Sequence, residues 1–284
     1  MSQETAIPLD FKARLNPVLT RDTVFFNKEE CAALGRSFHD EYVNAHPFPH
    51  AVLDDFLPRE MLRRVILEFP QWRPGRFSDR TSNLKTGYQL EAIDSPFITN
   101  LMYAFNSAQF LAFLEALTGI EGLIPDPYYL GGGLHETLRG GHLGVHVDFN
   151  THEPFGLLRR LNLILFLNEN WQDSWGGHLE LWDRTMEHRA RSLAPVMGRT
   201  VVFNTDPGSF HGHPDPLAAP EGVSRRSIAL YYYTAPRDGC LPAARTTNFQ
   251  PRPGSSDPRS SLRVKVRYFV RDRLLPIIGR RIFK

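Results

Sequence analysis

Residues 161–182 read LNLILFLNENWQDSWGGHLELW. Two short runs in this stretch, Leu161–Leu167 and His178–Trp182, are rich in apolar residues, and Asn, Asp and Gly residues separate them. Runs of this kind favour β-strands, and the residues between them favour turns. The stretch therefore predicts two strands of a β-rich core.

The same pattern continues on both sides of this stretch, from Pro125 to about residue 235. It adds the runs Tyr128–Leu130, Leu143–Phe149, Thr200–Phe203 and Ser227–Tyr233. Several short strands separated by turn signals predict a sandwich or barrel rather than repeated βαβ units. We therefore expect a mainly β protein.

The first part of the chain predicts the helices that flank this core. Asn27 is the expected N-cap of a helix that runs toward Tyr42, Pro58 begins a second helix, and residues 98–118 repeat apolar side chains at helical spacing. Residues 71–95 are polar and predict a loop. The fold class is therefore mainly β with flanking helices (α+β).

Three regions follow from this organisation. We expect a helical lead-in over residues 1–45, a β-rich domain with supporting helices over 46–235, and a linker with a basic tail over 236–284. Overall, 42% of the 284 residues are hydrophobic and 23% are charged, which is ordinary globular usage. No apolar run approaches the ~20 residues of a membrane span.

The two cysteines and the N-terminal sequence predict a cytoplasmic protein. Cys31 and Cys240 lie far apart and form neither a metal-binding spacing nor a disulfide framework. The first residues, MSQETAIPLD, do not have the basic and apolar regions of a secretory signal. We expect no nucleic-acid partner.

The charge is distributed unevenly. Residues 236–284 contain twelve Lys or Arg and three Asp, a net charge of +9, which leaves −7 for residues 1–235 of the +2 total. Residues 262–284 combine an apolar stripe at helical spacing with arginines repeated every four residues, namely Leu262, Val266, Phe269, Val270 and Leu274 with Arg263, Arg267 and Arg271. Such a segment either lies on an anionic membrane, making the protein peripheral, or packs on its own domain.

Candidate metal ligands lie in residues 141–149, GHLGVHVDF. Residues two apart in a strand point to the same face, so His146 and Asp148 can meet one ion. An imidazole and a carboxylate are two of the three groups in the facial triad of non-haem Fe(II) oxygenases.

A third ligand is available in residues 209–213, SFHGH. His211 and His213 share a face if this segment is extended, so spacing alone leaves both open. We choose His211, in part because Gly212 permits close backbone approach beside it.

Strand alternation over residues 224–233 places Arg225, Ser227, Ala229 and Tyr231 on one face and Arg226 on the other. A guanidinium with a nearby hydroxyl can hold a carboxylate, so Arg225 and Ser227 are a candidate anion clamp. We expect four other polar residues to lie outside the metal site, either on the surface or at strand ends: Glu180, His178, His142 and His152.

The order of these motifs resembles the prolyl 4-hydroxylase-like Fe(II)/2-oxoglutarate dioxygenases. The resemblance is close over residues 125–235 and looser over 47–57. Its motifs are, in order, His146-x-Asp148, residues 161–168, Trp171, residues 176–182, Phe203-Asn204, His211-Gly212 and Arg225-x-Ser227.

The resemblance implies a double-stranded β-helix (jelly-roll) core within residues 46–235. It also implies iron ligands His146, Asp148 and His211, and Arg225 for 2-oxoglutarate, assisted by Tyr128 or Tyr129. The implied cofactors are Fe(II) and 2-oxoglutarate, with ascorbate as a candidate reductant. The implied reaction is hydroxylation of a C–H bond with O2, releasing succinate and CO2, and an intact Asp148 favours this over halogenation.

Two alternatives to this function are a cupin-like metal enzyme that does not use 2-oxoglutarate and a non-catalytic jelly-roll binding module. The Arg-x-Ser pair argues against the first, and the complete set of candidate ligands argues against the second. The substrate stays open between a peptidyl proline, a free amino acid and a sugar- or lipid-linked small molecule.

Overall fold

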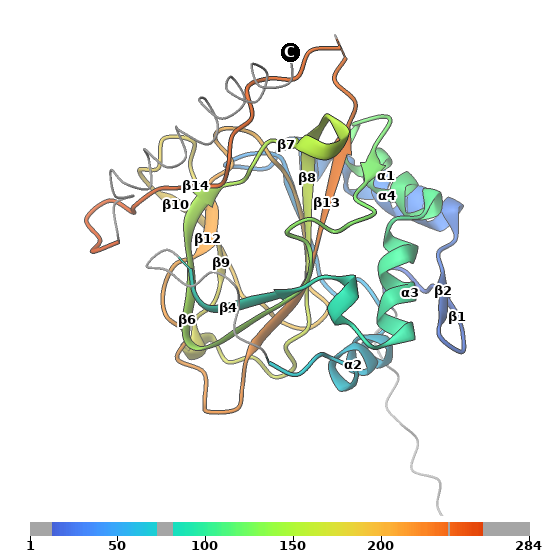
Figure 1. The fold of residues 1–284 in the computed structure, drawn as a ribbon, viewed down its shortest axis with the longest axis horizontal. Coiled ribbons are helices and arrows are strands. Elements are labelled where there is room, and N and C mark those ends of the chain that lie inside the picture. Colours follow the sequence, from blue (N-terminus) through green and yellow to red (C-terminus); the bar gives the residue numbers. More distant parts are fainter. Residues whose placement is uncertain (1–12, 73–81, 238, 258–284) are drawn as a thin grey trace, which may run out of the picture.

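The computed structural model describes residues 13–72, 82–237 and 239–257. The strands form a curled β-sheet, and the helices α1 to α4 gather on one side of it (Figure 1). The predicted tail helix, with its apolar stripe and arginines, lies outside the described residues. No helix in the described part of the chain is long and apolar enough to cross a membrane.

Four α-helices form the supporting layer: α1 (Lys28–Val43), α2 (Arg59–Leu67), α3 (Pro96–Phe105) and α4 (Ala108–Thr118). The expected cap is confirmed, because the Asn27 side chain accepts a hydrogen bond from the backbone N–H of Glu30 at 3.0 Å. The helical pattern over 98–118 is divided into two helices at Asn106. There the Ser107 hydroxyl accepts a hydrogen bond from the backbone N–H of Phe110 and begins a new helix.

These helices present aromatic side chains to the sheet. Phe110 of α4 lies between two other rings, with centroid distances of 5.0 Å to Phe26 and 4.8 Å to Phe105. Phe56 and Phe113 extend the same group, and all five side chains are buried. This apolar layer packs against the outer face of the sheet, and the inner face lines the cavity.

A short hairpin, β1 (Val18–Thr20) with β2 (Thr23–Phe25), precedes the main sheet. The main sheet has twelve strands, and its principal order is β10-β9-β12-β6-β13-β8-β11-β3. Its strands are β3 (His50–Leu53), β4 (Ser82–Tyr88), β5 (Ile124–Pro125), β6 (Gly133–Val147), β7 (Thr151–His152), β8 (Leu157–Phe166), β9 (Leu179–Trp182), β10 (Arg189–Leu193), β11 (Thr200–Asn204), β12 (His211–His213), β13 (Arg225–Thr234) and β14 (Asn248–Phe249). Three 3₁₀ turns complete the fold: Leu90–Ala92, Glu153–Phe155 and Asp173–Trp175.

All of the strand pairs in this sheet are antiparallel, and the curled sheet confirms the predicted jelly-roll core. Neighbours along the chain are often not neighbours in the sheet, as when β12 pairs with β6 and β11 pairs with β3. Such crossovers bring residues that are far apart in the sequence onto one wall of the cavity.

The long strand β6 organises this wall. Its first half lies between β4 and β13, and its second half contacts β12 and β14. The change of partners follows a bend at Gly140, whose φ of 77° is in the left-handed region that glycine adopts readily. The bend directs the end of β6, which carries His146, toward β12.

Several segments differ from the sequence-based expectation. Tyr128–Leu130 is a turn and not a strand, because the Asp126 carboxylate accepts hydrogen bonds from the backbone N–H groups of Tyr128 and Leu130 at 2.8 and 2.7 Å. The region 71–95, expected to be a loop, contains β4. The expected linker after residue 235 contains β14, which pairs with β6 at His146 and Val147.

Candidate metal centre

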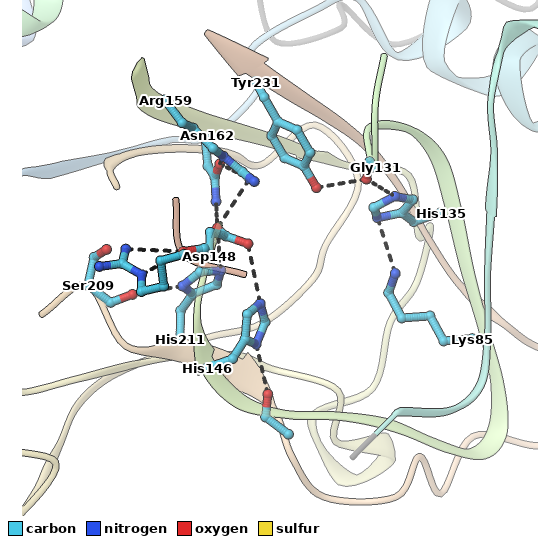
Figure 2. Close-up of polar contacts among 12 residues, drawn as sticks. Lys85, Gly131, His135, His146, Asp148, Arg159, Asn162, Ser209, His211 and Tyr231 are labelled. Atoms are coloured by element: carbon cyan, nitrogen blue, oxygen red, sulfur yellow. Dashed lines mark hydrogen bonds and ion pairs between the residues drawn. The ribbon is translucent and has the colours of Figure 1, made fainter. Parts of the chain in front are cut away.

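Three candidate metal-binding groups converge on one point of the cavity wall. His146 is near the end of β6, Asp148 follows it directly, and His211 begins β12 as the register partner of His146. Their ligand atoms all lie within 4.8 Å of one another, and all three residues are buried. Figure 2 shows the two imidazoles and the carboxylate facing one another.

Both imidazoles are oriented by backbone carbonyls. Nδ1 of His146 lies 2.9 Å from the carbonyl oxygen of Gly144, and Nδ1 of His211 lies 2.9 Å from that of Ser209. Since a carbonyl oxygen only accepts, each Nδ1 carries the proton and each Nε2 keeps a free lone pair. This is the arrangement in which metal-bound histidines are usually held.

Two neighbouring side chains orient the Asp148 carboxylate. Its Oδ2 accepts a hydrogen bond from Nδ2 of Asn162 at 2.6 Å and lies 3.2 Å from Nη2 of Arg159. Burial disfavours the ionised form, but the charge of Arg159 and the neighbouring His211 and His146 outweigh it and hold the pKa of Asp148 well below its usual value. Asp148 is therefore an anion, as a metal ligand must be.

His211 is held in its neutral form. Burial, followed by the proximity of His146, lowers the pKa of His211 to about 4. A neutral imidazole offers its Nε2 lone pair at ordinary pH. The donor set of two imidazoles and one carboxylate fits a divalent transition metal such as Fe(II).

The candidate ligands line a cavity of about 290 Å³. Its wall also contains the predicted anion clamp, because Arg225, Ser227, Ala229 and Tyr231 of β13 all face it, as the alternation predicted. Arg226 points away, and its Nε donates to the buried Glu136 carboxylate at 2.9 Å.

Arg225 is prepared to bind an anion. Its Nε donates to the carbonyl oxygen of Gly177 at 2.7 Å, and its guanidinium lies 4.9 Å from the ring centroid of Phe166. Burial lowers the pKa of Arg225 to about 9, which indicates a poorly compensated charge. In the described part of the chain, no carboxylate forms an ion pair with Arg225.

Sequence reasoning missed several polar residues of the cavity, among them Lys85 and His135. Lys85 was hidden because its strand, β4, falls in the region expected to be a loop. The alternation of Leu84, Thr86 and Tyr88 with polar or small residues in Ser82–Tyr88 was the available signal. Tyr128 and Tyr129 do not line the cavity: Tyr128 is exposed, and Tyr129 is buried in the main core.

His213 is not a solvated loop residue. It is 4% exposed and lines the cavity, and burial, with the nearby Arg225 and Lys85, lowers its pKa well below the usual value. It lies outside the three-group cluster, in which β12 is represented by His211.

The other four polar candidates also lie outside the three-group cluster. Glu180 is buried and not exposed as expected, because Nε1 of Trp182 and Nη1 of Arg189 donate to its carboxylate at 2.9 and 2.8 Å. His178 pairs with Asp173 at 2.8 Å. His152 is buried beside Asp126, and His142 is half-buried on β6.

The segment that follows β13 and contains Arg245, Thr247 and Phe249 borders one side of the site. Thr247 and Phe249 line the cavity, and the ring centroid of Phe249 lies 5.2 Å from that of His146. Arg245 donates from Nη2 to the backbone carbonyl oxygen of Asp148 at 3.1 Å. This segment therefore contributes to the shape of the cavity, although the sequence predicted only a linker there.

Comparisons with known proteins match the same region. The sequence model of the 2OG-Fe(II) oxygenase superfamily matches residues 132–233, which include the three-group cluster and Arg225. Prolyl 3-hydroxylase OGFOD1 of Mus musculus is 38% identical over an alignment of 80 residues that covers 26% of this chain. The match spans only 14% of the length of that relative.

The fold is similar to that of a prolyl hydroxylase from Trichoplax adhaerens, solved in complex with a peptide fragment of the hypoxia inducible factor oxygen degradation domain. The TM-score is 0.52 at 17% sequence identity, and the match covers 72% of this chain and 91% of that chain. At this level of identity the likeness shows the fold alone.

Proposed function

We propose that this chain, which belongs to the 2OG-Fe(II) oxygenase superfamily through residues 132–233, is an Fe(II)- and 2-oxoglutarate-dependent hydroxylase. The observation that carries the proposal is the convergence of His146, Asp148 and His211 within the matched region. Both imidazoles offer Nε2 and the carboxylate is ionised, so the three groups suit one divalent iron.

Bound Fe(II) would supply the activation of O2, with 2-oxoglutarate converted to succinate and CO2. The residues of this chain bind and orient the reactants. Arg225 and Ser227 would hold the distal carboxylate of 2-oxoglutarate, since a buried guanidinium with a nearby hydroxyl favours a carboxylate. Leu179, Ile164 and Phe249 supply apolar wall that limits the access of water.

For the substrate, we propose a prolyl side chain in a protein or peptide as the first class to test. The mouse relative is named a prolyl 3-hydroxylase, and the Trichoplax protein was solved with a peptide. The cavity, about 290 Å³, has room for 2-oxoglutarate and a group the size of one side chain. A small-molecule substrate would fit the same space.

Succinate release tests the reaction class. The purified full-length protein, incubated with Fe(II), 2-oxoglutarate, O2 and ascorbate as the expected reductant, should release succinate. The release should be lost in Asp148→Ala. A cupin-like enzyme that does not use 2-oxoglutarate, or a non-catalytic binding module, would release none, and that result would contradict the proposal. Peptide libraries containing proline, analysed by mass spectrometry for added oxygen, then test the substrate class.

The basic tail carries a separate proposal that rests on the sequence alone. We propose peripheral contact of residues 262–284 with an anionic membrane from the cytoplasmic side, since each basic residue near anionic lipid contributes about 1 kcal/mol. Co-sedimentation with anionic vesicles should be salt-sensitive and should be lost in a chain ending at Ser260. Full-length protein that stays in the supernatant at low salt would contradict this contact.

A further inference from the structure

Two cations flank β6 in one row of the sheet. Thr137 of β6 has Arg225 of β13 as its register partner on one side and Lys85 of β4 on the other. Register partners on adjacent strands point to the same face, and both cationic side chains line the cavity. Strands β4 and β13 lie about 10 Å apart across β6, so the two long side chains can reach a group between them.

Lys85 is oriented by a chain of contacts that ends on one carbonyl (Figure 2). The carbonyl oxygen of Gly131 lies 3.1 Å from Nε2 of His135 and accepts a hydrogen bond from the Tyr231 hydroxyl at 2.8 Å. Nε2 of His135 therefore carries the proton, and its Nδ1 faces Nζ of Lys85 at 3.5 Å. The contact is long, and both residues line the cavity.

The space beside His135 is kept open by its strand neighbour. Gly87 of β4 is the register partner of His135, and a side chain added there would place its Cβ 3.3 Å from the imidazole ring. Gly87 therefore lets the His135 ring lie close to β4, the strand that carries Lys85.

The cavity wall around Lys85 and Arg225 carries more positive than negative charge. Among the residues that line the cavity, Lys85 and Arg225 are the cations. Asp148 is the carboxylate among these lining residues, and it already pairs with Arg159. Within residues 13–72, 82–237 and 239–257, no carboxylate forms an ion pair with Lys85 or Arg225. Two half-buried or buried cations without a counter-ion favour an anionic ligand.

We propose that Lys85 is a second cation for the distal carboxylate of 2-oxoglutarate, which it holds together with Arg225. This inference rests on the proposed function. Arg225 approaches the carboxylate from β13 and Lys85 from β4, so two strands on opposite sides of β6 enclose one anion. A ligand that lacks the distal carboxylate gains nothing from either residue.

Calorimetric titration under anaerobic conditions tests the pair. The full-length protein, loaded with Mn(II) in place of Fe(II), is titrated with 2-oxoglutarate and with 2-oxopentanoate, which has the same chain length without the distal carboxylate. Lys85→Met should weaken 2-oxoglutarate binding about 10- to 100-fold, the usual range for losing a hydrogen bond to a charged group. Binding of 2-oxopentanoate should change by less than about twofold. Lys85→Arg should retain most of the affinity.

The matched control is Lys28→Met, since Lys28 is an exposed lysine on α1, remote from the cavity lining. It should leave both affinities unchanged. If Lys85→Met weakens both ligands equally, the residue supports the fold and not the anion, and the proposal is wrong. If it weakens neither, the distal carboxylate does not contact Lys85. Wild-type protein that binds Mn(II) but no 2-oxoglutarate would instead overturn the proposed function itself.

Discussion

Asn162 donates a hydrogen bond of 2.6 Å from Nδ2 to Oδ2 of Asp148. Asp148 directly follows β6, Asn162 lies on β8, and both are buried. Arg159 contacts the same oxygen at 3.2 Å and donates to Oδ1 of Asn162, so the amide is itself fixed in place. The carboxylate is therefore oriented before any metal binds.

This hydrogen bond predicts that Asn162 supports metal binding by orienting the Asp148 carboxylate. Asn162→Ala should weaken Mn(II) or Fe(II) binding about 10- to 100-fold, because the loss of a group that orients a ligand typically costs this much. Anaerobic calorimetry with Mn(II) measures the effect, and Asn44→Ala, at an exposed asparagine after α1, is the control. Unchanged affinity would show that Asp148 needs no support from Asn162.

The two histidines of β12 should behave differently. His211→Ala should abolish tight Mn(II) binding and succinate release, because it removes one of three converging ligand groups. His213→Ala should keep metal binding, since His213 lines the cavity outside that group. The reverse pattern would transfer the third ligand position to His213.

Substitutions of the two adjacent arginines of β13 should have different effects, one on ligand binding and the other on the stability of the protein. Arg225→Met should weaken 2-oxoglutarate binding about 10- to 100-fold without lowering the stability of the free protein, because the residue is a buried cation without a carboxylate partner. Arg226→Met should leave the affinity unchanged and destabilise the protein by about 1–3 kcal/mol, because it removes a partner of the buried Glu136. Urea unfolding and calorimetry measure both effects. If both substitutions weakened 2-oxoglutarate binding equally, the assignment of Arg225 to the cavity face and of Arg226 to the opposite face would be wrong.

Much of the site follows from local sequence. His146 and Asp148 are two residues apart at the end of β6, and Arg225 and Ser227 are two residues apart in β13. The alternation of extended backbone is enough to predict that each pair lies on one face. A β-rich sandwich or barrel could be predicted because its apolar runs and turns lie within residues 125–235, and the family resemblance implied the jelly-roll form. The resemblance supplied the order in which these pieces combine.

Other parts depend on contacts that no local pattern contains. Lys85 reaches the cavity only because β4 pairs with the far side of β6, about fifty residues along the chain. Glu180 is buried because Arg189 and Trp182 satisfy its carboxylate. Tyr128–Leu130 is a turn because Asp126 caps it. In each case a long-range or side-chain contact overrides the local propensity.

The affinity for 2-oxoglutarate should fall as the pH rises through about 8. Burial, followed by the charge of Arg225, lowers the pKa of Lys85 to about 8 in the free protein, while Asp148 acts in the opposite direction. The groups that face Lys85 are His135 of β6, Arg225 of β13, Asp148 after β6 and His213 of β12, and of these only Asp148 is an anion. A bound carboxylate would raise the pKa of Lys85 again, so its contribution to binding is complete below the lowered pKa and is lost above it. The dissociation constant should then increase by up to about tenfold per pH unit. Lys85→Arg should shift the fall in affinity to higher pH, because a guanidinium has a higher intrinsic pKa than an ammonium group. A wild-type profile that is already flat across the same range would exclude Lys85 as the second cation.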